Sequence, residues 1–147
     1  MTGHMSLYKN VLHNSNNSLP KWFLETIGVY VSILNDCDYC IEHHFSGLER
    51  LLNDDKKSAQ IKIDLENENK PVVEKKYNKA LAYVKELTLR PSAVKELMIV
   101  EMRKEGLTDG EILEVNQVVS YFNYANRTVL GLGVSTKGDV IGLSPNN

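Results

Sequence analysis

The chain has 147 residues, of which 42% are hydrophobic and 24% are charged, and its formal net charge is −2. These values are typical of one globular domain with its own core. The near-balanced charge provides no basic surface for nucleic acid or for an anionic membrane. No apolar run approaches the roughly 20 residues of a membrane-spanning helix, and the polar N-terminus lacks the layout of a signal peptide. We therefore expect a cytoplasmic protein without nucleic-acid or membrane partners.

The chain is predicted to divide into an arm, one helical domain and a tail. Residues 1–18 are polar and are expected to be an irregular arm, of which residues 1–5 resemble a cloning remnant. His4 is given no functional role for that reason. The domain is predicted over 19–134, and the tail over 135–147.

The first predicted helix, over 20–34, is apolar on every side. Glu25 is the only charged residue between Lys21 and Asp36. A helix that is apolar all round is a buried helix, so Glu25 is expected to lie in the interior. Gly28, three residues later on the same face, would let a neighbouring element approach closely.

The remaining pattern predicts an all-α domain of five or six helices. A second helix is expected to be capped by Asn35 or Asp36 and to run to about Asn53. Thr108 and Glu111 form a capping box that opens a long last helix, which is expected to end near Gly131–Gly133. Between them, a short helix and loop are predicted over 54–68, and a helix restarts at Lys70-Pro71, runs through Leu87 and is broken at Arg90-Pro91-Ser92. Another helix is predicted over 93–104, with Gly106 as its C-cap.

Both cysteines lie at the start of the second predicted helix, and a histidine follows them. At helical spacing Cys37, Cys40 and His44 share one face, and His44 is the direct neighbour of Cys40. A thiol beside a general base is the arrangement of an activated nucleophile. In a cytoplasmic protein such a pair is more often catalytic or metal-binding than structural.

The charges around the cysteines do not favour a thiolate. Asp36, Asp38 and Glu42 are acidic neighbours, which raise the pKa of a thiol that lies close to them, and no nearby Lys or Arg offsets them. Proton transfer to His44 and the buried Glu25 is therefore expected to supply the activation. Helical Cβ atoms three residues apart are about 5–6 Å from each other, whereas a disulfide needs about 3.8 Å. A Cys37–Cys40 bond is therefore expected to distort the first turn and to be reducible.

These residues carry a family resemblance. Glu25, Cys37, Cys40 and His44 fit the E-x11-C-x-x-C-x-x-x-H pattern of AhpD-like alkylhydroperoxidases, in the carboxymuconolactone decarboxylase-like superfamily. Residues 121–127 and 132–134 resemble the last helix of the peroxidase-related branch. The family implies an AhpD-like helical bundle that assembles into trimers or hexamers. It also implies a peroxide-reducing cycle without haem or metal, driven by a dithiol or lipoyl-type reductant.

The resemblance assigns a role to each residue of the pattern. Cys40 would be the peroxidatic thiolate, and Cys37 would donate a proton and then resolve the oxidised Cys40 as a disulfide. Glu25 and His44 would form the proton relay. Tyr39 stands where characterised AhpD proteins have a histidine, which removes one proton carrier and is similar to the peroxidase-related branch.

Other interpretations of the same residues remain open. Cys37, Cys40, His43 and His44 could form a zinc site, although a second cysteine pair is missing. The cysteines could be two small buried residues, or the dithiol could sense redox state without significant peroxidase turnover. Decarboxylase-type chemistry is a weaker alternative, because that branch does not rely on a cysteine pair. His43 points away from His44 and is interpreted as a surface or interface residue, while Asn126 and Arg127 are interpreted as links between helices.

Overall fold

We analysed a computed structural model that describes residues 2–71 and 73–142; Met1, Val72 and the end of the predicted tail (143–147) lie outside the described residues. The described residues form seven α-helices, one short 3-10 helix and no strand. The elements are α1 (Thr2–Leu12), α2 (Lys21–Leu34), α3 (Asp38–Leu52), α4 (Asp55–Glu66), α5 (Lys75–Leu89), η1 (Pro91–Ala93), α6 (Glu96–Lys104) and α7 (Asp109–Leu132). The all-α prediction is confirmed, with one helix more than expected.

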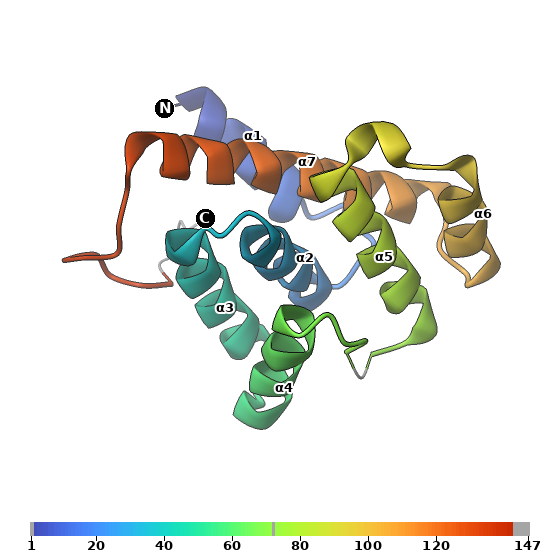
Figure 1. The fold of residues 1–147 in the computed structure, drawn as a ribbon, viewed down its shortest axis with the longest axis horizontal. Helices are drawn as coiled ribbons and strands as arrows, with labels where there is room; N and C mark the ends of the chain where they lie inside the picture. Colours follow the sequence, from blue (N-terminus) through green and yellow to red (C-terminus); the bar gives the residue numbers. More distant parts are fainter. Residues whose placement is uncertain (1, 72, 143–147) are drawn as a thin grey trace.

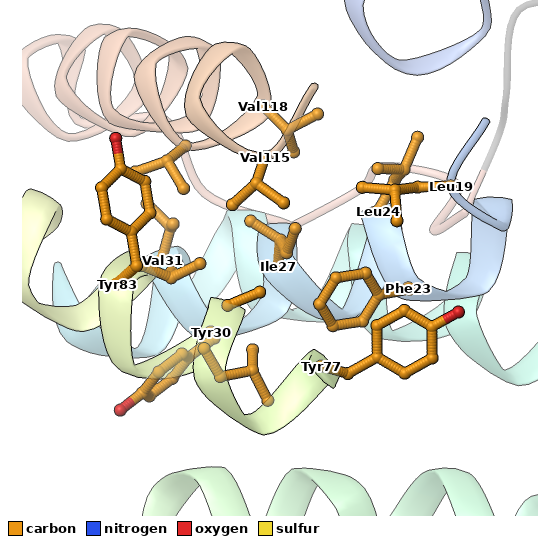
Figure 2. Close-up of a cluster of buried hydrophobic side chains, with 14 of the residues drawn as sticks. Leu19, Phe23, Leu24, Ile27, Tyr30, Val31, Tyr77, Tyr83, Val115 and Val118 are labelled. Carbon is orange, nitrogen blue, oxygen red and sulfur yellow. The ribbon is translucent and has the colours of Figure 1, made fainter. Parts of the chain in front are cut away.

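Helix α2 lies at the centre of the molecule, and Figure 1 shows the other helices arranged around it. It contacts α3, α4, α5 and α7, and every residue from Phe23 to Ser32 is buried. The side chains of Phe23, Leu24 and Ile27 meet those of α5 and α7 in the core (Figure 2). The prediction that this helix is buried on all sides is confirmed, because its neighbours cover both its polar and its apolar positions.

Helix α7 spans the molecule and begins at the predicted capping box. The Thr108 hydroxyl accepts from the backbone N–H of Glu111, and the Glu111 carboxylate accepts from the N–H of Thr108. The helix ends at Leu132, and its C-cap Gly133 has a left-handed backbone (φ +65°) that a residue with a Cβ rarely adopts. Both ends therefore match the signals in the sequence.

The irregular arm predicted over 1–18 is wrong for residues 2–12, which form α1. This helix contacts α7, and its Leu12 is buried while Tyr8 and Val11 pack against the core. Its polar residues face outward, and its buried stripe is short. The hydrophobic periodicity of this segment therefore indicated a helix only weakly. Packing on α7 stabilises a helix that its own sequence favours little.

Several boundaries also differ from the predicted ones. Helix α5 begins at Lys75, after the predicted start near residue 70, and residues 91–93 form η1 ahead of α6. Helix α6 has Glu105 as its C-cap, and Gly106 follows with a left-handed backbone (φ +96°). Within the described residues, no helix is both long and apolar enough to cross a bilayer.

Candidate active site

Helix α2 carries Glu25 into the interior, as its apolar surroundings predicted. The residue is 6% exposed. Burying a carboxylate without a partner is costly, so a hydrogen-bond donor beside it is required. Its position on the central helix fixes the carboxylate within the core rather than on a loop.

His44 of α3 is that donor. Its Nδ1 lies 2.8 Å from Oε2 of Glu25. A carboxylate only accepts hydrogen bonds when ionised, so Nδ1 carries the proton in this pair and Nε2 of the neutral ring is left as an acceptor. A histidine oriented in this way by a carboxylate is suited to remove a proton from a thiol. The structure thus brings together two of the predicted site residues that are distant in sequence.

Two glycines let the helices approach closely enough to make this pair. A Cβ added at Gly47 of α3 would lie 3.3 Å from Cδ of Glu25. A Cβ added at Gly28 of α2 would overlap the ring of Phe122 from α7. That ring and the ring of His44 pack in a T-shaped arrangement, with ring centroids 4.5 Å apart and planes at 90°. The expectation that Gly28 permits a close approach is confirmed, and the approaching group also packs on His44.

Cys37 and Cys40 form a disulfide, and their Cα atoms are 5.3 Å apart. Both residues are buried, with Cys37 0% and Cys40 5% exposed. The predicted cap at Asn35 or Asp36 is wrong, because Cys37 itself is the N-cap residue of α3 and makes no side-chain cap bond. Its backbone (φ −100°, ψ 83°) is not helical. The two sulfurs therefore bond across the boundary of the helix rather than within a regular first turn.

The turn between α2 and α3 is attached to α7 by a partly buried network of side-chain amides. Asp36 in this turn has a left-handed backbone (φ 53°). The side chain of the preceding Asn35 donates to the side-chain oxygens of Asn123 and Asn126, each at 3.1 Å. Asn126, which is fully buried, donates in turn to the hydroxyl of Ser32 at 3.2 Å. The interpretation of Asn126 as a link between helices is confirmed, and the link positions the segment that leads into Cys37.

His13, immediately after α1, is a nearby residue that the sequence did not single out. Its ring packs edge-on against Tyr8 with centroids 4.7 Å apart. Its Nε2 is buried and has no hydrogen-bond partner among the described residues. Burial lowers the pKa of His13, and the charge of Glu25 opposes that shift. His13 therefore lies within the electrostatic reach of the Glu25–His44 pair.

A cavity of about 600 Å³ reaches the Glu25–His44 pair. Its lining includes Tyr8 of α1, Glu25 of α2, His44 of α3 and Tyr121 of α7. Burial raises the pKa of Tyr121, with the charges of Tyr8, Tyr124 and Glu25 adding to the effect, so the phenol stays protonated. Neither cysteine is among the described residues that line the cavity. His4, which the sequence gave no role, also lines it and lies 3.4 Å from the Tyr121 hydroxyl.

Tyr39 and His43 lie on the side of α3 that faces the tail. The Tyr39 hydroxyl donates to Oδ2 of Asp139 at 2.9 Å, and the rings of Tyr39 and His43 pack with centroids 4.5 Å apart. Burial and this hydrogen bond raise the pKa of Tyr39, and the same bond is the main cause that lowers the pKa of Asp139. His43 thus contacts the tail and is separate from the His44 pair. Among the described residues, no three His, Cys, Asp or Glu side chains are grouped so as to hold a metal.

Comparison with known proteins gave matches at the level of structure. No family model and no curated protein matches the chain. A peroxidase-related protein from Silicibacter sp. TM1040, described as uncharacterized, has 21% identity and a TM-score of 0.80, covering 91% of this chain and 68% of its own. An AhpD-core, peroxidase-related protein from Ralstonia eutropha JMP134 has 20% identity and a TM-score of 0.79, covering 99% and 70%.

A third solved structure comes from Agrobacterium tumefaciens. It is a protein of unknown function named as a candidate antioxidant defence protein AhpD, with 19% identity and a TM-score of 0.76. The match covers 91% of this chain and 88% of that protein. All three neighbours bear AhpD or peroxidase-related descriptions, and the similarity extends over nearly the whole chain. This chain therefore has the AhpD-like fold of the peroxidase-related proteins.

Proposed function

We propose that the chain is a cysteine-based hydroperoxide reductase that cycles Cys37 and Cys40 between dithiol and disulfide. The hydrogen bond between His44 Nδ1 and the buried Glu25 carboxylate supports this proposal most directly. It prepares Nε2 of a histidine four residues after Cys40 to accept a proton. The Cys37–Cys40 disulfide is the oxidised product that such a cycle would leave.

The proposed cycle begins with transfer of the Cys40 proton to the Glu25–His44 pair. The Cys40 thiolate attacks one peroxide oxygen, the O–O bond breaks, and the sulfur becomes a sulfenic acid. The departing alkoxide takes the proton of the Cys37 thiol and leaves as an alcohol. The Cys37 thiolate then attacks the Cys40 sulfur, an S–S bond forms, and hydroxide leaves as water with the proton held by the relay.

An external dithiol closes the cycle by thiol–disulfide exchange. It reduces the Cys37–Cys40 bond and becomes a disulfide itself, so one hydroperoxide and one dithiol are consumed per turnover. The proposed cycle uses the two sulfurs and no resident cofactor. A lipoyl-type dithiol is a suitable donor class, and the reducing cytoplasm is the compartment in which the dithiol form would be maintained.

Peroxide consumption by the purified protein tests this proposal. Hydrogen peroxide and cumene hydroperoxide are each supplied with dithiothreitol or dihydrolipoamide, and peroxide loss is followed with time. The native protein is expected to turn over, and Cys40→Ser is expected to be inactive. An equal rate in Cys40→Ser would contradict the mechanism.

A second function is favoured by the burial of the sulfurs. Both cysteines are at most 5% exposed, and neither lines the cavity. Such a dithiol could act as a redox sensor that switches state without peroxidase turnover. This function predicts a reversible Cys37–Cys40 disulfide by mass spectrometry together with negligible peroxide consumption in the assay above.

We also propose that the chain forms a homo-oligomer, a trimer or a hexamer. Exposed apolar side chains gather at the end of α7 and just beyond it, where Leu130, Leu132 and Val134 are 47%, 76% and 44% exposed. Apolar surface of this kind is often covered by a partner subunit. The structure describes one chain, so the proposal depends on these residues and on the AhpD-like fold.

A further inference from the structure

The chain after α7 returns to α3 and docks on it, as the trace in Figure 1 shows. We call residues 139–142 the docked tail. Asp139, the first residue of the docked tail, is bound to α3 through its side chain. Its Oδ2 accepts from the Tyr39 hydroxyl at 2.9 Å and lies 3.5 Å from His43 Nε2. The other oxygen of the carboxylate accepts from the backbone N–H of Val140 at 2.9 Å, which orients the turn.

Gly142 attaches the other end of the docked tail. Its N–H donates to His43 Nδ1 at 3.3 Å, and its carbonyl accepts from Nη1 of Arg50. Since His43 Nδ1 accepts here, the neutral ring carries its proton on Nε2, the atom that faces Asp139. Gly142 has a left-handed backbone (φ +76°), and a Cβ on it would overlap Ser46. Only glycine fits at this point of contact.

The four α3 residues that meet the docked tail form one stripe on the helix. Tyr39, His43, Ser46 and Arg50 are separated by four, three and four residues, the spacing of a single helical face. Tyr39 lies between the two cysteines, and His43 precedes the relay histidine. The docked tail is therefore fixed on the face of α3 next to the one that carries Cys40 and His44.

The docked tail also forms part of the cavity. Asp139, Val140 and Gly142 line it together with Glu25 and His44. The other walls belong to packed helices, whereas the docked tail is joined to α3 by a few hydrogen bonds, and its Asp139 side chain is 41% exposed. Of these walls, the tail can be displaced at the smallest cost in buried contacts.

We propose that the docked tail is a specificity-determining wall of the candidate active site, which limits the size of the molecule that enters the cavity beside His44. Neither cysteine lines this cavity in the disulfide form; the reduced Cys40, one helical turn before His44, is reached through it. Compact hydroperoxides pass with the tail in place, and bulky ones are restricted by it. The inference rests on the proposed function for its substrate class. The wall itself can be tested through thiol access, without peroxidase turnover.

The test compares small and bulky thiol reagents on the reduced protein. Alkylation of Cys40 by iodoacetamide and by fluorescein maleimide is followed by mass spectrometry in native protein, Asp139→Ala and Gly142→Ala. Asp139→Ala removes the contacts to Tyr39 and His43, and Gly142→Ala displaces the tail by overlap with Ser46. Both variants are expected to raise the maleimide rate at least fivefold while the iodoacetamide rate stays within twofold. The small reagent corrects for any change in thiol reactivity.

Lys137→Ala is the matched control, because Lys137 is an exposed residue of the same segment outside the docked tail. Its ratio of maleimide to iodoacetamide rates should equal that of native protein. An unchanged ratio in both Asp139→Ala and Gly142→Ala would overturn the proposal. In the peroxide assay, the two variants should lower KM for cumene hydroperoxide relative to hydrogen peroxide. If native protein consumes neither peroxide, the proposed hydroperoxide reductase function is contradicted. The ratio of maleimide to iodoacetamide rates still decides whether the docked tail acts as a wall.

Discussion

The carboxylate of Glu25 determines what His44 can do, because it accepts a hydrogen bond from Nδ1–H of the ring and leaves Nε2 free to act as a base. Replacement by Gln keeps the shape but removes the negative charge that stabilises a protonated ring. We predict that Glu25→Gln lowers the rate of peroxide consumption by about 10²-fold or more, the scale of general-base catalysis. Steady-state peroxide loss with a fixed dithiol donor measures the effect.

Glu42→Gln is the control for that change. Glu42 is exposed on α3, between Cys40 and His44 in sequence. Its replacement by Gln is the same chemical change as Glu25→Gln, but it leaves the contact between Glu25 and His44 in place. Its rate should stay within about threefold of the native rate, since a screened surface charge contributes little. Equal losses in the two variants would mean that general charge, rather than the Glu25–His44 contact, controls the reaction.

Single residues differ in how well the sequence reveals them. Glu25 could be identified because a lone charge in an apolar helix must find a buried partner. Cys37, Cys40 and His44 could be identified because helical spacing groups them. Asp139, which lines the cavity, and His13, whose pKa responds to the charge of Glu25, could not, because each lies on a segment whose position depends on tertiary packing. No local pattern encodes a contact over 100 residues, such as that between Tyr39 and Asp139.

At the scale of helices, Gly28 permits the contact between α2 and α7 that also holds His44. The Phe122 ring occupies the space of a Cβ at Gly28 and meets the His44 ring edge-on. We predict that Gly28→Ala reduces the free energy of unfolding by about 1–3 kcal/mol through overpacking. Urea denaturation followed by circular dichroism measures it. Gly131→Ala on α7, where a Cβ would meet nothing within 4 Å, should be neutral or stabilising.

The amide network between the α2–α3 turn and α7 gives a second prediction at this scale. Asn126→Ala removes one hydrogen-bond partner each from Asn35 and the Ser32 hydroxyl, and it empties a fully buried position. We predict a loss of about 1–3 kcal/mol in the free energy of unfolding. Asn16→Ala, at an exposed position, should change it by less than about 0.5 kcal/mol. Equal effects in the two variants would argue against the network.

Helix boundaries were predicted correctly where the sequence carries a strong capping signal. The capping box at Thr108 and the glycine after Leu132 located α7 at both ends. The start of α3 was misplaced because Asn35 and Asp36 are good cap residues in general, yet here Asn35 bonds to α7 and Asp36 adopts a left-handed turn. Tertiary contacts, together with the disulfide at Cys37, took precedence over local capping preference.

At the scale of the whole molecule, the all-α fold could be predicted because long amphipathic and apolar runs are scarcely interrupted by glycine or proline. The packing of α1 against α7 and the return of the tail to α3 could not, since both depend on which faces remain open after the core has formed. These two segments, at opposite ends of the chain, both line the cavity beside α2 and α3. The sequence therefore predicts the core of the domain better than it predicts which segments enclose the candidate active site.

The proposed oligomer is tested at this same scale. Leu132 is 76% exposed at the end of α7, and a charge there would oppose burial in a subunit interface. We predict that native protein measures as a trimer or hexamer by light scattering at micromolar concentration, and that Leu132→Glu shifts it toward the monomer. Leu97→Glu, at a 61% exposed position on α6, is the control and should leave the mass unchanged. A monomeric native protein would contradict the proposal.

The order of events at the two sulfurs is tested most directly by trapping. Reduced Cys37→Ser is treated with one equivalent of hydrogen peroxide and dimedone, and the modified residue is identified by mass spectrometry, with Cys40→Ser as the comparison. The proposed cycle predicts a dimedone adduct on Cys40 in the first variant and a Cys37–Cys40 disulfide in the native protein under the same conditions. An adduct that forms on Cys37 of Cys40→Ser at an equal rate, or no adduct on Cys40, would contradict it.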